Sequence, residues 1–561
     1  MAKQHGYQAL GQWHEISLLP LNSADSSAAP RAMRGRKPIP AAAVRAAARP
    51  NTDAEAIVSV VNESSVLQTR IGDPTQLAVV QGSVPARRAA AGAGPARRSP
   101  ISTYGAMTLV TPTVIAEGLR QDDLKAAKSF GAEVVEEGLD GKVLLRVQEV
   151  DRVFGLVDLL LQREVGSATP NFLRRVAHTR HSAPATAWSL DKVGVPRAWE
   201  ITKGHKDIKV AVLDEGVDTS HPALKPAVVA ERDFIGNNGN SAMPGGDDAH
   251  GTACAGVVLS RDRRFSGIAP RCSLIAARIA TDDGTGHWVF DDFATADAID
   301  WCWRQGAAIL SNSWGGGAPS DAISRAFARA RTQGRGGLGS LVVIAAGNDE
   351  TVIDFPGDLP NYVTVGASNP ADERKTHTSS DGETWWGSNF GATMTLLAPG
   401  VFIWTTDISG SSGYESGNFT KTFNGTSSAT PAVAGAAALM LSVNPTLSAS
   451  AIRSLLTTTS KKLKGQTAWT QELGWGRLDV AKAVEAAKSA GSAPPVGVKK
   501  APGKKARAKK APGKKARAKK APVKKATVKK ARGKKVVAKK APARKGSATK
   551  ASTRRRAAAR R

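Results

Sequence analysis

Short apolar runs alternate with helical segments over residues 188–490. The runs include IKVAVLD, LIAARIA, AAILSNSW, LVVIAAGN, YVTVGAS and MTLLAPG. Strands that are buried on both faces have this continuous apolar character, so we expect an α/β fold with a mostly parallel sheet flanked by helices. In open sheets of this kind, reactive groups gather beyond the carboxyl ends of the strands. Two of the predicted strands lead into Asp214 and Asn348.

A different pattern occupies residues 101–180. Four segments predict strands (MTLVTPTVIAE, AEVVEE, KVLLRVQ and TPNFLRRVAH), and two predict helices (DDLKAAKSF and DRVFGLVDLLLQRE). The predicted order is β-α-β-β-α-β, the split βαβ arrangement of a small α+β module. The polar stretch TRHSAPATAW separates this module from the α/β region.

Both ends of the chain have compositions that predict disorder. Residues 1–100 are rich in Ala, Arg, Pro and Ser, and we expect them to be mostly disordered, with one short strand around Ala56–Val61. Residues 495–561 repeat a unit of Lys, Ala and Pro, APGKKARAKK. Such a segment cannot bury a core against its own charge repulsion, so it is expected to be disordered when free.

The net charge of +30 comes almost wholly from the C-terminal end. Of the 78 Lys and Arg residues, 29 lie between Lys499 and Arg561, where there is no Asp or Glu. This tail resembles the Ala-Lys-Pro tails of linker histones and of some bacterial nucleoid proteins. Through residues 499–561 we expect it to bind DNA or another polyanion by counterion release, without base readout. Attachment to anionic lipid or a cell-surface polymer, and simple solubilisation, are the alternatives.

Several classes of protein are excluded by what the chain lacks. Three cysteines (Cys254, Cys272 and Cys302) are too few for a disulfide scaffold. No apolar run is long enough to span a bilayer, and the first residues lack the basic and apolar regions of a signal peptide. We therefore expect a cytoplasmic monomer without a transmembrane segment, with non-standard secretion left open.

Four segments carry the residues of an acyl-transfer site. They are LDEGVDTSHP with Asp214, HGTACAG with His250, AAGNDE with Asn348, and NGTSSATP with Ser427. Each alone is equally typical of a turn or a helix cap. Together they supply a nucleophile, a base, a carboxylate that orients the base, and an amide donor for an oxyanion.

These motifs, in the order Asp, His, Ser, resemble the subtilisin family of serine peptidases. The resemblance covers residues 188–490 and implies a subtilisin-like fold and a serine endopeptidase. It implies that Ser427 is the nucleophile, that His250 is the general base and then the general acid, and that Asp214 orients this histidine. It also implies that the Asn348 amide and the backbone N–H of Ser427 bind the oxyanion.

Local patterns around these residues predict their settings. Ser427 opens the segment SSATPAVAGAAALMLSV, which predicts a buried helix with Pro431 in its first turn and the nucleophile at the N-terminal dipole. Cys254 lies one helical turn after His250, where thiol-dependent subtilisins have a free cysteine; we interpret it as a small buried residue rather than a mercurial-sensitive site. Glu215 stands where the family usually has a small or hydroxylated residue. Strand alternation predicts that it points to solvent, whereas a Glu215 that faced the site would raise the pKa of His250.

The resemblance also implies where substrate binds. Two segments match those that pair with the substrate backbone as added strands: Gly284, Thr285, Gly286 and Ser313, Trp314, Gly315. Trp288 is expected to border the pocket for the fourth residue upstream of the cut. The first pocket would have walls of Ala345, Ala346 and Gly347 and a floor at Asp354, which would favour Lys or Arg. The alternative is a broad apolar preference with Asp354 facing solvent.

The upstream module resembles the family's propeptide, a folding chaperone and inhibitor, with Arg180 as a self-cleavage point; an unrelated small domain is the alternative. Calcium is common in the family. The acidic clusters Asp247–Asp248 and Asp291–Asp292 lack the spacing of a calcium loop, so structural calcium stays unassigned. We expect no catalytic metal and no required cofactor. The alternative function is a nucleoid-associated DNA-binding protein with a latent peptidase domain.

Overall fold

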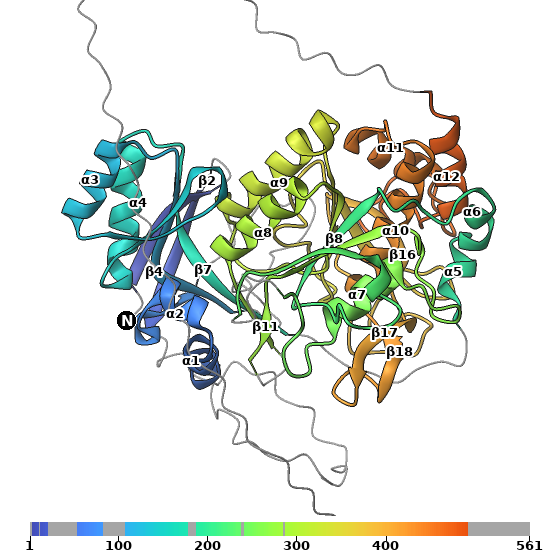
Figure 1. The fold of residues 1–561 in the computed structure, drawn as a ribbon, viewed down its shortest axis with the longest axis horizontal. Coiled ribbons are helices and arrows are strands. Elements are labelled where there is room, and N and C mark those ends of the chain that lie inside the picture. The colour runs from blue at the N-terminus through green and yellow to red at the C-terminus, as the bar shows by residue number, and fades with distance from the viewer. Residues whose placement is uncertain are drawn as a thin grey trace, which may run out of the picture. The chain divides into compact units, whose positions relative to one another are not determined.

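The α/β region contains the predicted parallel sheet. The computed structural model describes residues 3–9, 12–20, 53–81, 107–177, 187–236, 241–283 and 287–491, so the basic tail lies outside the described residues. Seven parallel strands follow the order β16-β15-β14-β13-β8-β10-β9 (Figure 1). Their bounds are β8 Lys209–Asp214, β9 Val228–Asp233, β10 Ser273–Arg278, β13 Ala307–Asn312, β14 Leu341–Ala345, β15 Val363–Ser368 and β16 Met394–Pro399. All except β9 were predicted from the apolar runs, and the predicted α/β class with a mostly parallel sheet is confirmed.

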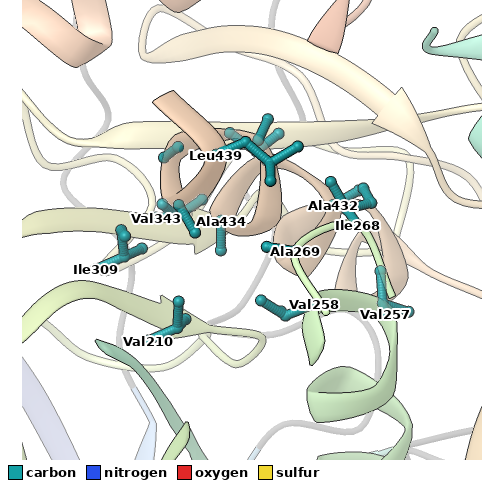
Figure 2. Packing of buried hydrophobic residues seen from close by; sticks show 14 of the residues in the cluster. Val210, Val257, Val258, Ile268, Ala269, Ile309, Val343, Ala432, Ala434 and Leu439 are labelled. Atoms are coloured by element: carbon teal, nitrogen blue, oxygen red, sulfur yellow. The ribbon is translucent and has the colours of Figure 1, made fainter. Parts of the chain in front are cut away.

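Helix α10 (Thr426–Val443) lies in the core against this sheet. Its small residues let it approach closely: a Cβ added at Gly435 would lie 2.8 Å from the Cβ of Ile268. Figure 2 shows Ala434 and Leu439 of α10 among side chains of the sheet and of α7 (His250–Leu259). Among the described helices, α10 alone is long and apolar enough to cross a membrane, but 89% of it is buried inside the protein. Its apolar character therefore reflects its place in the core.

The upstream module has the predicted β-α-β-β-α-β order. Its elements are β4 Met107–Glu117, α3 Gln121–Phe130, β5 Glu133–Glu137, β6 Lys142–Arg146, α4 Val153–Gln162 and β7 Ser167–Ala177. β7 also pairs in antiparallel register with β12 (His287–Asp291) of the α/β region, which pairs with β11 (Thr281–Asp282). The module and the α/β region therefore share one sheet, in the order β1-β2-β3-β4-β7-β12-β11 with β5 and β6 as a branch.

The two faces of this sheet pack on different helices. Val110 and Phe172 belong to the cluster on the side of α4, whereas the neighbouring residues Leu109 and Leu173 pack on the other side. The second cluster includes residues of α8 (Asp292–Arg304) and α9 (Asp321–Gln333), which lie between the module and the parallel sheet (Figure 1). The alternation of side chains along each strand produces the two covered faces.

The expectation that residues 1–100 are mostly disordered is wrong for the parts that the structure describes. β1 (Lys3–Ala9), β2 (Gln12–Pro20) and β3 (Ala78–Gln81) extend the module's sheet. The segment predicted as a strand, Ala56–Val61, lies in α1 (Asp53–Glu63). Its buried residues Ile57, Val60 and Val61 have helical spacing, which a short apolar run does not separate from a strand.

The remaining elements complete the framework. They are α2 Ser65–Ile71, η3 Pro74–Gln76, η4 Leu139–Gly141, η5 Val150–Arg152, α5 Ser189–Lys192, α6 Val195–Ile201, η6 Lys225–Ala227, η7 Gly334–Gly337, the hairpin of β17 Ile403–Gly410 and β18 Gly417–Phe423, α11 Ala449–Thr459 and α12 Val480–Ser489.

Candidate active site

Asp214 and His250 meet at the carboxyl end of the parallel sheet. Asp214 is the last residue of β8, and His250 is the first residue of α7. The Nδ1 atom of His250 lies 2.9 Å from Oδ1 of Asp214, and both side chains are buried. The edges of Trp288 and Phe423 pack against the imidazole ring. When Nδ1 donates to the carboxylate, the other ring nitrogen, Nε2, is left able to accept a proton.

Ser427 lies in the first turn of α10. Its Oγ donates to the backbone oxygen of Ser313 at 3.3 Å, and the hydroxyl of Ser313 donates back to the backbone oxygen of Ser427 at 3.0 Å. To transfer its proton to His250, the Ser427 hydroxyl has to turn from Ser313 towards the imidazole ring.

Pro431 leaves the backbone oxygen of Ser427 available for contacts outside the helix. The predicted place of Pro431 in the first turn is wrong, because α10 begins at Thr426 and Pro431 is its sixth residue. At this position a proline removes the N–H that would bond to the oxygen four residues earlier, which is that of Ser427. The hydroxyl of Ser313 donates a hydrogen bond to this oxygen, and Sγ of Cys254 lies 3.5 Å from it.

The sulfur of Cys254 links the two helix starts. It lies 3.7 Å from Nδ1 of His250 as well as 3.5 Å from the oxygen of Ser427. Burial, together with the charge of Asp214, raises the pKa of the Cys254 thiol well above its usual range. The thiol therefore stays protonated and is not a nucleophile at neutral pH. Its complete burial agrees with the interpretation as a small core residue.

Asn348 follows β14 and is exposed. The backbone N–H and the hydroxyl of Thr426 approach one atom of its side chain at 2.8 and 3.0 Å. A backbone N–H can only donate, so this atom is the oxygen Oδ1. The amide Nδ2 is therefore the group available to donate to an oxyanion next to Ser427.

Comparisons with known proteins identify the family of the chain. The model of the subtilase family matches residues 205–476. The chain is 32% identical over 299 residues to thermitase from Thermoactinomyces vulgaris, a match that covers 52% of this chain and 94% of thermitase. The chain belongs to the subtilase family. It is a subtilisin-like serine endopeptidase.

Two further matches are less complete. A calcium-dependent protease from Nostoc sp. is 31% identical over 332 residues, which are 52% of this chain and 48% of that protease. The crystal structure of fervidolysin from Fervidobacterium pennivorans, a keratinolytic enzyme related to subtilisin, matches with a TM-score of 0.53 and 22% identity. It covers 67% of this chain and 61% of fervidolysin, and supports the fold.

Glu215 of this subtilase is buried, so the expectation that it points to solvent is wrong. Strand alternation stops applying here because the chain turns at Gly216, which has a φ of 120°. The Glu215 side chain has 0% relative exposure, and its Oε1 accepts the backbone N–H of His250 at 2.6 Å. Burial and the charges of Asp248 and Asp214 raise the pKa of Glu215 well above its usual range.

The structure places part of the expected substrate-binding surface. Ser313 is buried beside the nucleophile, Trp314 is buried and Gly315 is partly exposed; Ala345 and Ala346 are buried, and Gly347 is partly exposed. Asp354 is exposed, which favours the alternative in which it faces solvent. Trp288 is buried against the ring of His250. Gly284, Thr285, Gly286 and Arg180 lie outside the described residues.

The acidic clusters are matched by arginines. Asp291 pairs with Arg70 of α2 at 3.2 Å, and Asp292 pairs with Arg174 of β7 at 2.6 Å. Asp248 faces Arg278 at 3.8 Å. Among the described residues, the one group of three or more His, Cys, Asp or Glu side chains placed to share an ion is Asp214, His250 and Cys254. A thiol suits softer metals than calcium, so these residues do not fit a calcium site.

Sequence reasoning missed the three arginines, although one signal was present. Arg278 is a charged residue inside the apolar run LIAARIA, and such a residue needs a buried partner.

Proposed function

We propose that this subtilase hydrolyses peptide bonds through Asp214, His250 and Ser427, with Asn348 as an oxyanion donor. The observation that carries the proposal is the buried hydrogen bond between Asp214 and His250, next to a helix start that holds Ser427. His250 takes the Ser427 proton as the oxygen attacks the carbonyl carbon, and gives it to the leaving amine. In the second stage, water attacks the acyl-enzyme while His250 again acts as base and then as acid. Asp214 stabilises the imidazolium that forms in both stages.

The experiment uses three forms of the chain and one substrate. We expect casein hydrolysis by the full chain, and equal hydrolysis by a chain truncated after Gly497. The Ser427→Ala chain should have no activity above background. Loss of activity in the truncated chain, or persistence of activity in Ser427→Ala, would contradict the proposal.

The upstream module is proposed to act as the propeptide of the same enzyme. Support comes from β7, which pairs with β12 next to the expected substrate segment and places Arg174 on Asp292. We expect the active chain to cut itself between Ala177 and Trp188, whereas Ser427→Ala stays at its full mass of 58.5 kDa. Mass spectrometry of both proteins distinguishes these outcomes, and an uncut active chain would make the module a permanent domain.

The tail is proposed to bind a polyanion independently of catalysis. Its charge and lack of aromatic residues support phosphate-backbone binding rather than stacking. Ser427→Ala should keep DNA binding that falls steeply with salt, and the truncated chain should lose it. Calcium and the preference for Lys or Arg stay predictions; sequencing the cut sites of a peptide library tests the latter.

A further inference from the structure

Two adjacent residues hold His250 at two different atoms. Asp214 bonds to Nδ1 of the ring, whereas Glu215 accepts the backbone N–H of the same residue at 2.6 Å. The segment directly after them is packed closely against the chain that leads to His250, since a Cβ added at Gly216 would lie 2.8 Å from the Cα of Pro244. One short segment therefore fixes both the ring and the main chain of His250.

The helix that begins at His250 needs an acceptor from elsewhere in the chain. The first N–H groups of a helix have no partner within it, and the cap position of α7 is Ala249, which has no side-chain acceptor. The carboxyl of Glu215 accepts the first of these N–H groups, that of His250. A carboxyl oxygen can accept this N–H whether the group is ionised or protonated.

Glu215 is buried among other carboxyl groups. Asp214, Asp248 and Asp282 raise its pKa in addition to burial, and its Oε2 has no hydrogen-bond partner among the described residues. Nε of Arg278 donates to the backbone oxygen of Glu215 at 3.2 Å, and the ring of Tyr414 lies close enough to be affected by its charge. A buried carboxyl with an unpartnered oxygen lowers stability, so its presence calls for a role other than stabilising the fold.

We propose that Glu215 is a positioning residue of this peptidase, which holds the backbone of His250 so that its ring stays on Asp214 and faces Ser427. The proposal rests on the catalytic roles proposed above. Glu215 acts through the hydrogen bond to His250 and does not touch the substrate.

The test compares two changes at one position. Glu215→Ala removes the acceptor, and we expect kcat to fall by about 10- to 100-fold while KM changes little, because small displacements of a catalytic group cost rate rather than binding. Glu215→Gln keeps an oxygen that accepts the His250 N–H, so it should retain kcat within about threefold. Asp479→Ala is the matched control: it removes a carboxylate cap from α12, far along the chain, and should leave kcat unchanged.

A second measurement separates this proposal from the catalytic one. In the inactive Ser427→Ala chain, the downfield proton signal of the His250 Nδ1–H bonded to Asp214 should disappear with Glu215→Ala and persist with Glu215→Gln. An unchanged signal and an unchanged kcat in Glu215→Ala would overturn the positioning role, as would an equal loss of kcat in Glu215→Gln. If the parent chain is inactive but the signal behaves as expected, the catalytic proposal fails and the positioning of His250 stands.

Discussion

Two acidic regions of the peptidase use buried carboxylates in opposite ways. At the module interface, defined by Asp291 and Asp292 at the start of α8, the arginines Arg70 and Arg174 bind the carboxylates directly. The carboxylate of Asp292 accepts hydrogen bonds from both Nε and Nη2 of Arg174, at 2.6 and 3.1 Å. The side chains of this region keep all their oxygens bonded, as expected of a structural contact.

The catalytic edge, defined by Asp214, Glu215 and Asp248, is different. Each of these three buried carboxyls has one oxygen without a hydrogen-bond partner among the described residues. Arg278 is the arginine nearest to Asp248, and burial with the added charge of Asp282 still raises the pKa of Asp248 to about 7. The interface is therefore arranged for stability, whereas the edge keeps carboxyl oxygens unpaired around His250, the proposed base.

The largest effect is expected from removing the ion pair between Arg174 and Asp292 at the module interface. In the Ser427→Ala chain, which stays intact, Arg174→Met should lower the free energy of unfolding by about 3–5 kcal/mol, because Asp292 is left buried without its partner. Urea denaturation measures this loss. A second change, Asp292→Leu, should recover most of it, and a loss below about 1 kcal/mol in Arg174→Met would place the pair among weak surface contacts.

The next effect concerns the side-chain amide of Asn348. Asn348→Ala should lower kcat by about 10²–10³ with little change in KM, because the amide bonds to the oxyanion only in the transition state. That range was itself established for a member of this family. Initial rates on a peptide substrate measure the change. Thr426→Val, which removes only one of the two donors to Oδ1, should cost less; an equal loss would point to local distortion instead.

The catalytic edge should become more stable when its charge is reduced. The pKa of Asp248 is about 7 in the fold and near 3.8 otherwise, so the unfolded chain releases this proton first and stability falls as pH rises from about 4 to 7. Asp248→Asn removes this loss and should gain ~2–4 kcal/mol at pH 8 and little at pH 4. Denaturation at the two pH values checks the sign, and a variant that is less stable at pH 8 would refute it.

The smallest effect is expected from an exposed ion pair, which serves as the reference for the buried pairs. Lys125 and Asp122 form an ion pair at 2.9 Å on α3, and both side chains are 76% exposed. Lys125→Ala should change the free energy of unfolding by less than about 0.5 kcal/mol, since water screens an exposed pair. A loss comparable to that of Arg174→Met would remove the distinction between buried and exposed charge.

The sequence predicted the peptidase core well because its signals are local. Continuous apolar runs predicted the strands that end at Asp214 and Ala345, and the small residues after Ser427 predicted a buried helix. The residue types of four motifs, with their resemblance to the subtilisin family, predicted which side chains belong to one site. The comparisons confirm the family that those motifs resemble, and the roles of the single residues stay predictions.

The remaining features depend on contacts between distant residues. Arg70 and Asp291 are 221 positions apart, and no local pattern pairs them. Glu215 escapes strand alternation because the chain turns at the next residue, and the contacts of the Ser427 oxygen depend on where α10 begins relative to Pro431. The helix at Ala56–Val61 was mistaken for a strand because a short apolar run fits both periods.

Labelling with a fluorophosphonate tests the central claim most directly. The active chain is treated with the probe, digested and examined by mass spectrometry, beside the His250→Ala chain. The account predicts that the phosphonyl group is found on Ser427 in the active chain and is nearly absent in His250→Ala, where no base takes the serine proton. Labelling of a different hydroxyl, or equal labelling of Ser427 without His250, would contradict it.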